Sequence, residues 1–269
     1  MTTEKETIKP QLMKAVLTVK EKQVLTPHYI RIILEGEDLG IYAQANEGDN
    51  NKILIPLDKS AKLTLPDGPV KGGDAKLAMR TYTMRSLDLE KGEMAIDFVM
   101  HGETGPASTW AIHAEKGDEL GVLMKVKTKP LFQSAAYYFI MGDHTALPVI
   151  SVMLEKLPKD ASGDVLIEVY SEDDVLDLVK PANVNVKWVC NNAPGDTSML
   201  LPEFKRYDIT KETDKFVFAA AEFNVIKEIQ EVLRADDTLE RKNWYAFSYW
   251  KHGVAEDASA NDRRGLRNA

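Results

Sequence analysis

The sequence predicts two domains: an antiparallel β-barrel over residues 1–130, followed by a parallel-sheet α/β domain over residues 131–269. The chain has 269 residues, a length that suits one large domain or two medium ones. Its first half carries short β-prone runs between turn signals, and its second half alternates such runs with helical patterns. Hydrophobic residues make up 44% and charged residues 28%, which excludes a disordered or fibrous chain.

Six short β-prone runs define the predicted barrel. Asp67-Gly68-Pro69 and Gly72-Gly73 are turn signals between two of them. We expect one short helix to start at Gly105-Pro106, because proline favours the first helical position. The expected strands cover residues 15–20, 29–34, 52–57, 79–85, 94–100 and 120–125. Short, regularly spaced strands of this kind are typical of a small antiparallel barrel.

After Lys129-Pro130 the pattern changes to strands that alternate with helices. The expected strands cover residues 137–141, 165–170, 184–189, 216–221 and 244–250. The expected helices cover residues 146–157, 173–179, 198–207 (in part) and 225–234, and a polar tail covers 254–269. This alternation predicts a parallel sheet with helices on both faces.

Charge and cysteine content narrow the classes of function. Residues 1–130 hold 18 basic and 19 acidic residues, a balance of −1, whereas residues 131–269 hold 16 and 23, a balance of −7; together they give the net charge of −8. Because phosphate backbones repel an acidic chain, we expect no nucleic-acid partner. The single cysteine, Cys190, excludes an intrachain disulfide and a four-cysteine metal or iron–sulfur site. Electron transfer would therefore need an organic cofactor.

No apolar run approaches the ~18–20 residues that cross a bilayer. The first ten residues, Met1 to Pro10, are polar and lack the apolar centre of a secretion signal. We therefore expect a cytoplasmic protein without a membrane partner, and we expect it to be a monomer.

The first candidate segment for a site is Arg80-Thr81-Tyr82-Thr83, on a predicted strand. Two-residue alternation puts Arg80 and Tyr82 on one face. A guanidinium can bind phosphate oxygens through two hydrogen bonds, and a tyrosine ring can lie against a flat heterocycle. A barrel strand with a solvated arginine and a half-buried tyrosine explains the same residues without a ligand.

The second candidate segment runs from Asp97-Phe98-Val99 through His101 to Gly105-Pro106-Ala107-Ser108. The first amides of a helix have no partner within the helix, so the start at Gly105 could bind a pyrophosphate. An ordinary helix cap above a buried Trp110 is the alternative.

Two more segments lie in the α/β half. Gly142-Asp143-His144-Thr145-Ala146 follows the first strand, where open α/β sheets bind ligands. It lacks the GxGxxG pattern, but Asp143 could accept hydrogen bonds from a ribose or a base. Tyr249-Trp250-Lys251-His252 combines aromatic rings with cations that could attract an anion. A core strand that ends in a solvated turn is an equally good interpretation of this last segment.

In this order and spacing, RTYTMR, DFVMHGETGPASTWA, GDHTALPVI and YWKHG resemble the siderophore-interacting protein family. Members of this family are FAD-dependent ferric-siderophore reductases related to the ferredoxin–NADP reductase group. The resemblance covers residues 12–253, and it implies a FAD-binding barrel followed by a nicotinamide-binding type of α/β domain.

The resemblance also implies roles for individual residues. The FAD motif would be Arg80, Thr81, Tyr82 and Thr83, and the stretch along the flavin nucleotide would be Asp97, Phe98, Val99 and His101. The phosphate-binding helix start would be Gly105, Ala107 and Ser108. The cofactor crevice would contain Asp143, Thr145 and Ala146, with Trp250 near the flavin and the nicotinamide.

Three positions depart from the family pattern. His144 stands where glutamate is usual, Ala220-Ala221-Glu222 where Ala-Gly-Glu is usual, and Lys251 where arginine is frequent. The last two leave the nicotinamide site open, and with it the choice of electron donor.

The resemblance implies that NADH or NADPH reduces FAD, and that FAD then reduces Fe(III) to Fe(II) in a bound ferric siderophore. Reduced ferredoxin is an alternative donor. We expect no resident metal ion and no catalytic acid, base or nucleophile. Two rival functions are a general NAD(P)H:flavin or ferredoxin reductase and a non-catalytic siderophore-binding protein.

Many ferric siderophores are anions, so we expect a local basic patch. Lys52, Lys251 and His252 are the substrate-binding candidates. The other basic residues considered are Lys125, Lys127, Lys129, Arg263, Arg264 and Arg267.

Overall fold

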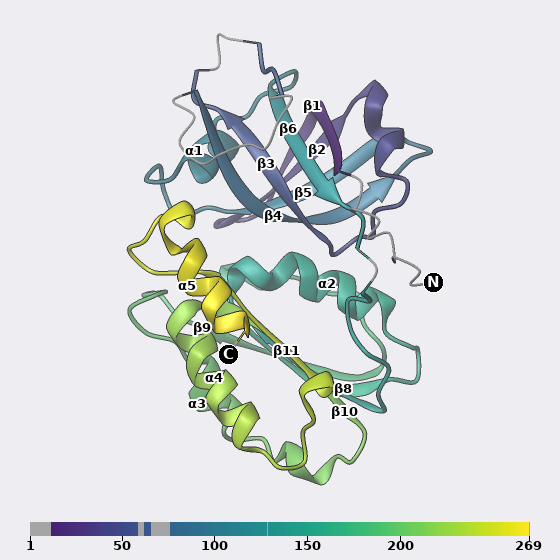
Figure 1. The fold of residues 1–269 in the computed structure, drawn as a ribbon, viewed down its shortest axis with the longest axis vertical. Helices are drawn as coiled ribbons and strands as arrows, with labels where there is room; N and C mark the ends of the chain where they lie inside the picture. The colour runs from purple at the N-terminus through teal and green to yellow at the C-terminus, as the bar shows by residue number, and fades with distance from the viewer. Residues whose placement is uncertain (1–11, 59–61, 66–75, 128, 269) are drawn as a thin grey trace, which may run out of the picture.

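The computed structural model describes residues 12–58, 62–65, 76–127 and 129–268. A β-barrel and a helix-covered sheet lie one above the other, with the N-terminal half of the chain in the barrel (Figure 1). Both predicted architectures are therefore confirmed. The turn signals at residues 67–69 and 72–73 lie outside the described residues.

The barrel is closed and antiparallel, with strand order β1-β2-β5-β4-β3-β6. Its strands are β1 (Leu12–Thr26), β2 (Tyr29–Glu35), β3 (Asn50–Pro56), β4 (Leu77–Asp88), β5 (Glu93–Val99) and β6 (Glu119–Lys125). Alternation along β5 puts Met94, Ile96 and Phe98 in the barrel core, where each is fully buried. Helix α1 (Pro106–Ile112) covers one end of this core through Trp110, and a 3-10 helix (Glu37–Tyr42) packs Leu39 and Tyr42 into it.

The sheet is parallel, with strand order β11-β10-β7-β8-β9. Its strands are β7 (Tyr137–Gly142), β8 (Ser162–Val169), β9 (Asn183–Cys190), β10 (Lys215–Glu222) and β11 (Trp244–Trp250). Its helices are α2 (Leu147–Lys156), α3 (Leu200–Phe204), α4 (Phe223–Ala235) and α5 (Glu256–Asn268). Because the strand order reverses between β7 and β10, the carboxyl ends of these two strands form the switch point where such sheets bind ligands.

Helix α2 lies between the sheet and the barrel, and α3 and α4 lie on the opposite face of the sheet (Figure 1). The two apolar clusters match this arrangement. One joins Ile150 and Met153 of α2 to the sheet, and the other joins Phe204 of α3 and Ile229 of α4 to its far face. The last barrel strand ends at Lys125 and the first sheet strand begins at Tyr137, and we propose to divide the two domains between them.

A hydrogen-bonded joint connects the domains on the side of β9. The carboxylate of Asp174 is fully buried and accepts hydrogen bonds from Thr26 Oγ1 (2.8 Å) and from the backbone N–H of His28 (3.0 Å). It also lies 2.9 Å from Nδ1 of His28 and accepts from Ser171 Oγ at 2.8 Å. Burial alone would raise the pKa of Asp174, but the bonds from His28, Thr26 and Ser171 outweigh it and lower the pKa to about 2.

Two predicted segments form a different kind of secondary structure from the one expected. The helix expected over 173–179 is only a 3-10 turn (Glu172–Asp174). The Asp174 side chain accepts hydrogen bonds from the backbone N–H and the hydroxyl of Ser171, and it also accepts from the barrel. The tail at 254–269 was expected to be polar, and it is, but most of it forms α5. Within the part of the chain described, no helix is long and apolar enough to cross a membrane.

Candidate functional site

The Arg80–Thr83 segment lies in the middle of β4. Arg80 pairs in register with Ile53 and Tyr82 with Asn51, so Arg80 and Tyr82 share one face, as predicted. The Tyr82 ring packs on Phe98 with a centroid distance of 4.5 Å, and Phe98 lies 5.7 Å from Trp110. Burial raises the pKa of Tyr82 well above its usual value, so the phenol stays neutral. Arg80 is the cation at the edge of this aromatic group.

The two threonines of the segment face the other domain. The backbone N–H of Thr81 donates to Oε2 of Glu256 at 2.8 Å, and its hydroxyl donates to the same carboxylate. Thr83 is buried, and its side chain interacts with the phenol of Tyr249 on β11. The predicted FAD motif therefore lies where the barrel meets the end of the sheet.

The side chains of β5 in the predicted site bond to, or pack on, other residues of the protein. Both carboxylate oxygens of Asp97 accept from Arg31, at 2.7 and 2.9 Å. Phe98 is in the barrel core, and Val99 packs beside Tyr29 at the domain interface. Asp97 therefore acts first as the buried partner of Arg31, and its predicted contact with a nucleotide stays a prediction.

The loop before α1 closes on itself. Ser108 Oγ donates to the carbonyl of Gly102 at 2.7 Å and accepts from the backbone N–H of His101 at 3.3 Å. Gly105, the N-cap residue, is extended and no side chain caps the helix there. Ala107 and Ser108 are buried, whereas His101 is exposed. The Ser108 hydroxyl is thus already bonded within the loop. A phosphate bound here would be contacted by backbone N–H groups instead.

The loop after β7 is unusually tight. A Cβ on Gly142 would lie 2.6 Å from Cβ of Ala146 and 2.8 Å from the carbonyl oxygen of Ala220. Asp143, which follows it, is buried, and its Oδ1 accepts from the backbone N–H of Thr145 at 2.9 Å. Its Oδ2 accepts from Nε1 of Trp250 at 2.7 Å. Burial raises the pKa of Asp143 to about 6, although the bonds from Thr145 and Trp250 oppose the rise.

His144 is buried between the domains. Its ring stacks on Tyr29 of the barrel at a centroid distance of 5.2 Å and meets the edge of Tyr170 at 5.1 Å. Neither ring nitrogen has a hydrogen-bond partner, and burial lowers the pKa of His144 to about 4. His144 therefore places a neutral ring in the domain interface, at the position where the resemblance predicts glutamate.

Two carboxylates at the same edge of the sheet were not among the predicted site residues: Glu168, which the sequence analysis did not name, and Glu222, which it named only within a departure from the family pattern. Glu168 of β8 accepts from Ser198 Oγ (3.0 Å) and the backbone N–H of Met199 (2.6 Å), which fixes the loop after β9. Glu222 of β10 accepts from the N–H of Asn224 (2.5 Å) and of His252 (3.2 Å). In the sequence, both residues could have been recognised as acidic residues at or next to the end of an apolar strand.

The substrate-binding candidates Lys52 and Lys251 are both paired with α5. Lys52 Nζ lies 2.8 Å from Glu256 and Lys251 Nζ 2.6 Å from Asp262. The third candidate, His252, is exposed and lies 3.9 Å from Asp196. Arg80 lies 3.6 Å from Asp257, also on α5. The structure thus brings two of the three substrate candidates, together with Arg80, to one helix.

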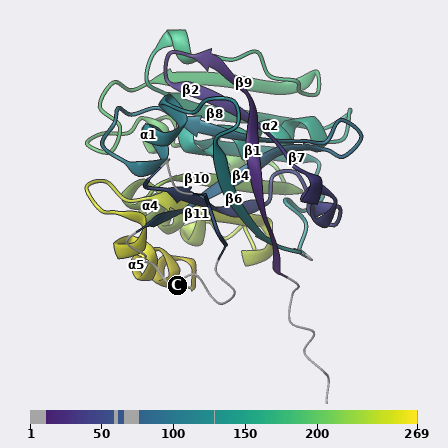
Figure 2. The same ribbon diagram turned by 90° about the horizontal axis from the view of Figure 1, so that it is seen from above.

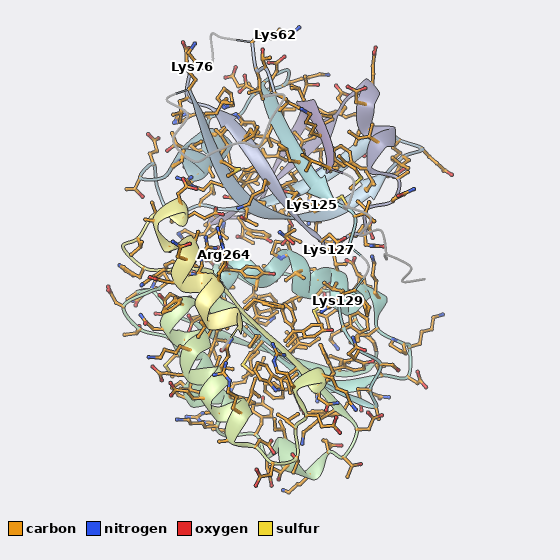
Figure 3. The ribbon with its side chains drawn as sticks, viewed as in Figure 1. Lys62, Lys76, Lys125, Lys127, Lys129 and Arg264 are labelled. Atoms are coloured by element: carbon orange, nitrogen blue, oxygen red, sulfur yellow. The ribbon has the colours of Figure 1, made fainter. Side chains whose placement is uncertain are left out.

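The other basic candidates separate into two groups. Figure 3 shows Lys125, Lys127 and Lys129 along the segment between the barrel and the sheet, and Arg264 on α5. Lys127 lies 3.5 Å from Asp49, away from α5. Arg263 donates to the carbonyls of Tyr249 and Glu256, both at 3.0 Å, so it holds the helix rather than faces solvent. The side chain of Arg267 lies outside the described residues.

The chemistry of these residues fits FAD. Tyr82 and Trp250 are half-buried aromatic rings on the two sides of the domain boundary. Arg80 is a half-buried cation on β4, and the start of α1 at Gly105 has no side-chain cap. A flavin needs flat apolar contacts and its pyrophosphate needs cations and backbone amides. Within the described ranges, no group of three or more His, Cys, Asp or Glu residues could hold a metal ion.

A closed antiparallel barrel joined to a five-stranded parallel sheet, with this site between them, defines the class of two-domain FAD-binding oxidoreductases. Family models agree: residues 18–125 match the siderophore-interacting FAD-binding domain, and residues 135–253 match the siderophore-interacting protein model. The chain belongs to the siderophore-interacting protein family, and it is a FAD-binding flavoprotein oxidoreductase.

Individual relatives match over almost the whole chain. The ferric vibriobactin reductase ViuB of Vibrio cholerae is 30% identical over 98% of this chain and 97% of its own length. The crystal structure of the siderophore-interacting protein SipS from Aeromonas hydrophila superposes with a TM-score of 0.83 at 33% identity, covering 95% of this chain and 98% of that one. A siderophore utilization protein from T. fusca gives 0.82 at 28% identity, covering 92% and 96%.

Proposed function

We propose that this protein reduces Fe(III) in a ferric siderophore to Fe(II) in the cytoplasm, as a monomer, with FAD as its redox centre. The observation that supports this most is the contact between the two halves of the site. Thr83 of the barrel motif meets Tyr249 of the sheet, and Trp250 beside it is held by Asp143. A flat cofactor bound there would contact both domains and leave one side for a substrate.

Each group of residues has one task in this proposal. Arg80 and the backbone at Gly105–Ser108 bind the phosphates, while Tyr82 and Trp250 contact the ring system. The Asp143–Trp250 hydrogen bond fixes the indole, and the joint at Asp174 fixes the distance between the domains. No side chain has to donate a proton to the iron chelate or accept one from it.

When bound, FAD would supply the redox chemistry that connects a two-electron hydride donor with a one-electron acceptor such as Fe(III). Fe(III) is a small, hard cation that hydroxamate and catecholate oxygens hold tightly, whereas Fe(II) is held much more weakly by them. Reduction is therefore the step that releases iron from the chelate.

We propose NADH or NADPH as the electron donor. The α/β half carries a balance of −7, and an acidic ferredoxin would be repelled by such a surface. Reduced ferredoxin stays the alternative donor, because the tight Gly142 loop is unlike the glycine-rich pyrophosphate loop of many reductases.

Anaerobic stopped-flow absorbance of the FAD-loaded protein tests this function. We expect the flavin absorbance to bleach when NADH or NADPH is added and to return when ferric siderophore is added, with Fe(II) trapped by a ferrous chelator. Bleaching without recovery would favour a general flavin or ferredoxin reductase. A protein that takes up no FAD on reconstitution and binds the ferric chelate unchanged would favour a siderophore-binding protein and would exclude the proposal.

A further inference from the structure

Helix α5 is folded back from the sheet onto the barrel. The chain reverses after β11 in a turn closed by a bridge between Lys251 and Val254, and Gly253 in this turn has a φ of +67°. Arg263 then ties the helix to the strand through its bonds to the carbonyls of Tyr249 and Glu256. Figure 2, seen from above, shows α5 at the edge of the molecule next to β11 and α4.

Three carboxylates of α5 meet three cations from different elements. Glu256 pairs with Lys52 of β3, Asp257 with Arg80 of β4, and Asp262 with Lys251 after β11. Lys52 and Lys251 are substrate-binding candidates, and Arg80 is the candidate phosphate ligand of FAD. One helix therefore supplies counter-charges to cations that the proposed function assigns to anionic ligands.

Glu256 is the best-held of the three. Its side chain is only 15% exposed and accepts from Lys52 Nζ, from the Thr81 N–H at 2.8 Å and from the Thr81 hydroxyl. Burial alone would raise the pKa of Glu256, but the charge and hydrogen bonds of Lys52 and Thr81 outweigh it and lower the pKa. It stands in the first turn of α5, where the helix dipole also favours a negative charge. Glu256 is thus an ionised carboxylate fixed beside Lys52.

We propose that Glu256 and Asp262 are specificity-determining residues that occupy Lys52 and Lys251 and direct the protein towards ferric chelates of low charge. This inference rests on the proposed function. A ferric tris-catecholate is a trianion, because each of its three ligands carries two negative charges. A ferric tris-hydroxamate is neutral, because each ligand carries one. Fixed carboxylates beside the site repel the trianion and leave the neutral chelate unaffected.

Binding of two chelates to the FAD-loaded protein tests the inference. Ferric enterobactin is the trianionic probe and ferrichrome the neutral one, and the dissociation constant of each is measured by quenching of tryptophan fluorescence. Glu256→Gln keeps the size of the side chain and removes its charge. We expect it to tighten enterobactin binding about fivefold at low ionic strength and to change ferrichrome binding less than twofold. Asp262→Asn should act in the same direction.

Asp208→Asn is the matched control. It removes one negative charge from an exposed pair with Lys211, far along the chain from α5, and both affinities should stay as in the wild type. The effect of Glu256→Gln should also shrink at 0.5 M salt, since salt screens charges. In the double variant Lys52→Gln with Glu256→Gln, the gain in enterobactin affinity should be lost, which separates removal of a counter-ion from loosening of α5.

The possible results decide between the two proposals. If both chelates bind and Glu256→Gln and Asp262→Asn leave the ratio of affinities unchanged, the specificity role is wrong and the proposed function stands. If neither chelate binds to the wild type or the variants, the proposed function fails and this inference fails with it.

Discussion

The indole N–H of Trp250 donates to Asp143 at 2.7 Å and joins the end of β11 to the loop after β7, 107 residues away in the chain. Asp143→Ala should release the indole and leave Trp250 free to turn. We expect the emission assigned to Trp250, taken as wild type minus Trp250→Phe, to shift towards that of a solvated indole. The unfolding free energy should fall by about 1–3 kcal/mol, because the half-buried indole N–H loses its hydrogen bond to a carboxylate. An unshifted spectrum would mean that the hydrogen bond does not orient Trp250.

The same pair should respond to pH, because the pKa of Asp143 is raised to about 6. Above that pH the indole donates to a carboxylate, and below it to a neutral acid. The Trp250 emission should therefore titrate near pH 6 in the wild type and stay flat in Asp143→Asn. His252→Gln serves as the control: its ring lies 6.2 Å from Trp250, and the titration should remain in this variant if Asp143 causes it.

His144→Phe should stabilise the protein at low pH. Phenylalanine keeps the stacking between Tyr29 and Tyr170 and removes two buried nitrogens without partners. The pKa of His144 is lowered to about 4, so the unfolded chain binds a proton there below pH ~6.5 that the folded chain does not, and wild-type stability is lost as the pH falls. The advantage of the variant in urea unfolding should grow by about 3 kcal/mol between pH 7 and pH 4. A difference that is constant with pH would contradict this account of His144.

Asp174→Ala should weaken the joint between the domains. The substitution leaves Thr26, His28 and Ser171 without their common acceptor, and we expect a loss of about 3–5 kcal/mol at pH 7. Because the folded pKa of Asp174 is lowered to about 2, its contribution is complete above pH ~4 and disappears as the pH falls towards 2. Denaturant unfolding at pH 7 and pH 3 measures both effects. Asp173→Ala, at the exposed neighbouring position, is the control and should cost little.

Gly195→Ala should displace His252. A Cβ at Gly195 would lie 1.8 Å from Nδ1 of His252, and the backbone there has a φ of +94°. Gly92 also has a positive φ, of +65°, but a Cβ there would meet nothing within 4 Å. Gly92→Ala therefore measures backbone strain alone, about 1 kcal/mol, and Gly195→Ala should cost more and shift the NMR signals of the His252 ring. Equal costs and an unmoved ring would show that the loop at Gly195 can give way.

The elements that the sequence predicted well are those with a strict apolar pattern. Met94, Ile96 and Phe98 alternate along β5, and β7 and β10 are continuous apolar runs, so their positions followed from periodicity. Strand β1 extends further than expected, to Leu12–Thr26, because a register shift between Val19 and Glu21 lets a polar stretch continue the pairing. Such irregularities leave no clear apolar pattern in the sequence.

Helix α5 could not be predicted in the same way. Its one large apolar side chain is Leu266, it contains Gly265, and its ion pairs join it to Lys52, Arg80 and Lys251 on other elements. Lys52 and Glu256 are 204 residues apart, so no local pattern connects them. The candidate site shows the same division: motifs proposed Arg80, Tyr82, Asp143 and Trp250, but no motif pointed to the carboxylates of α5 that pair with Lys52, Arg80 and Lys251.

The guanidinium of Arg263 bridges the carbonyl of Tyr249, beside the predicted flavin contact at Trp250, and that of Glu256, beside the predicted chelate contact at Lys52. The C-terminal end of β11 and the first turn of α5 are consequently expected to move together. A ligand that displaced α5 would therefore also displace the backbone at Tyr249, next to Trp250. Through Arg263, binding of the ferric chelate and the position of the predicted flavin contact would be coupled without direct contact between the two ligands.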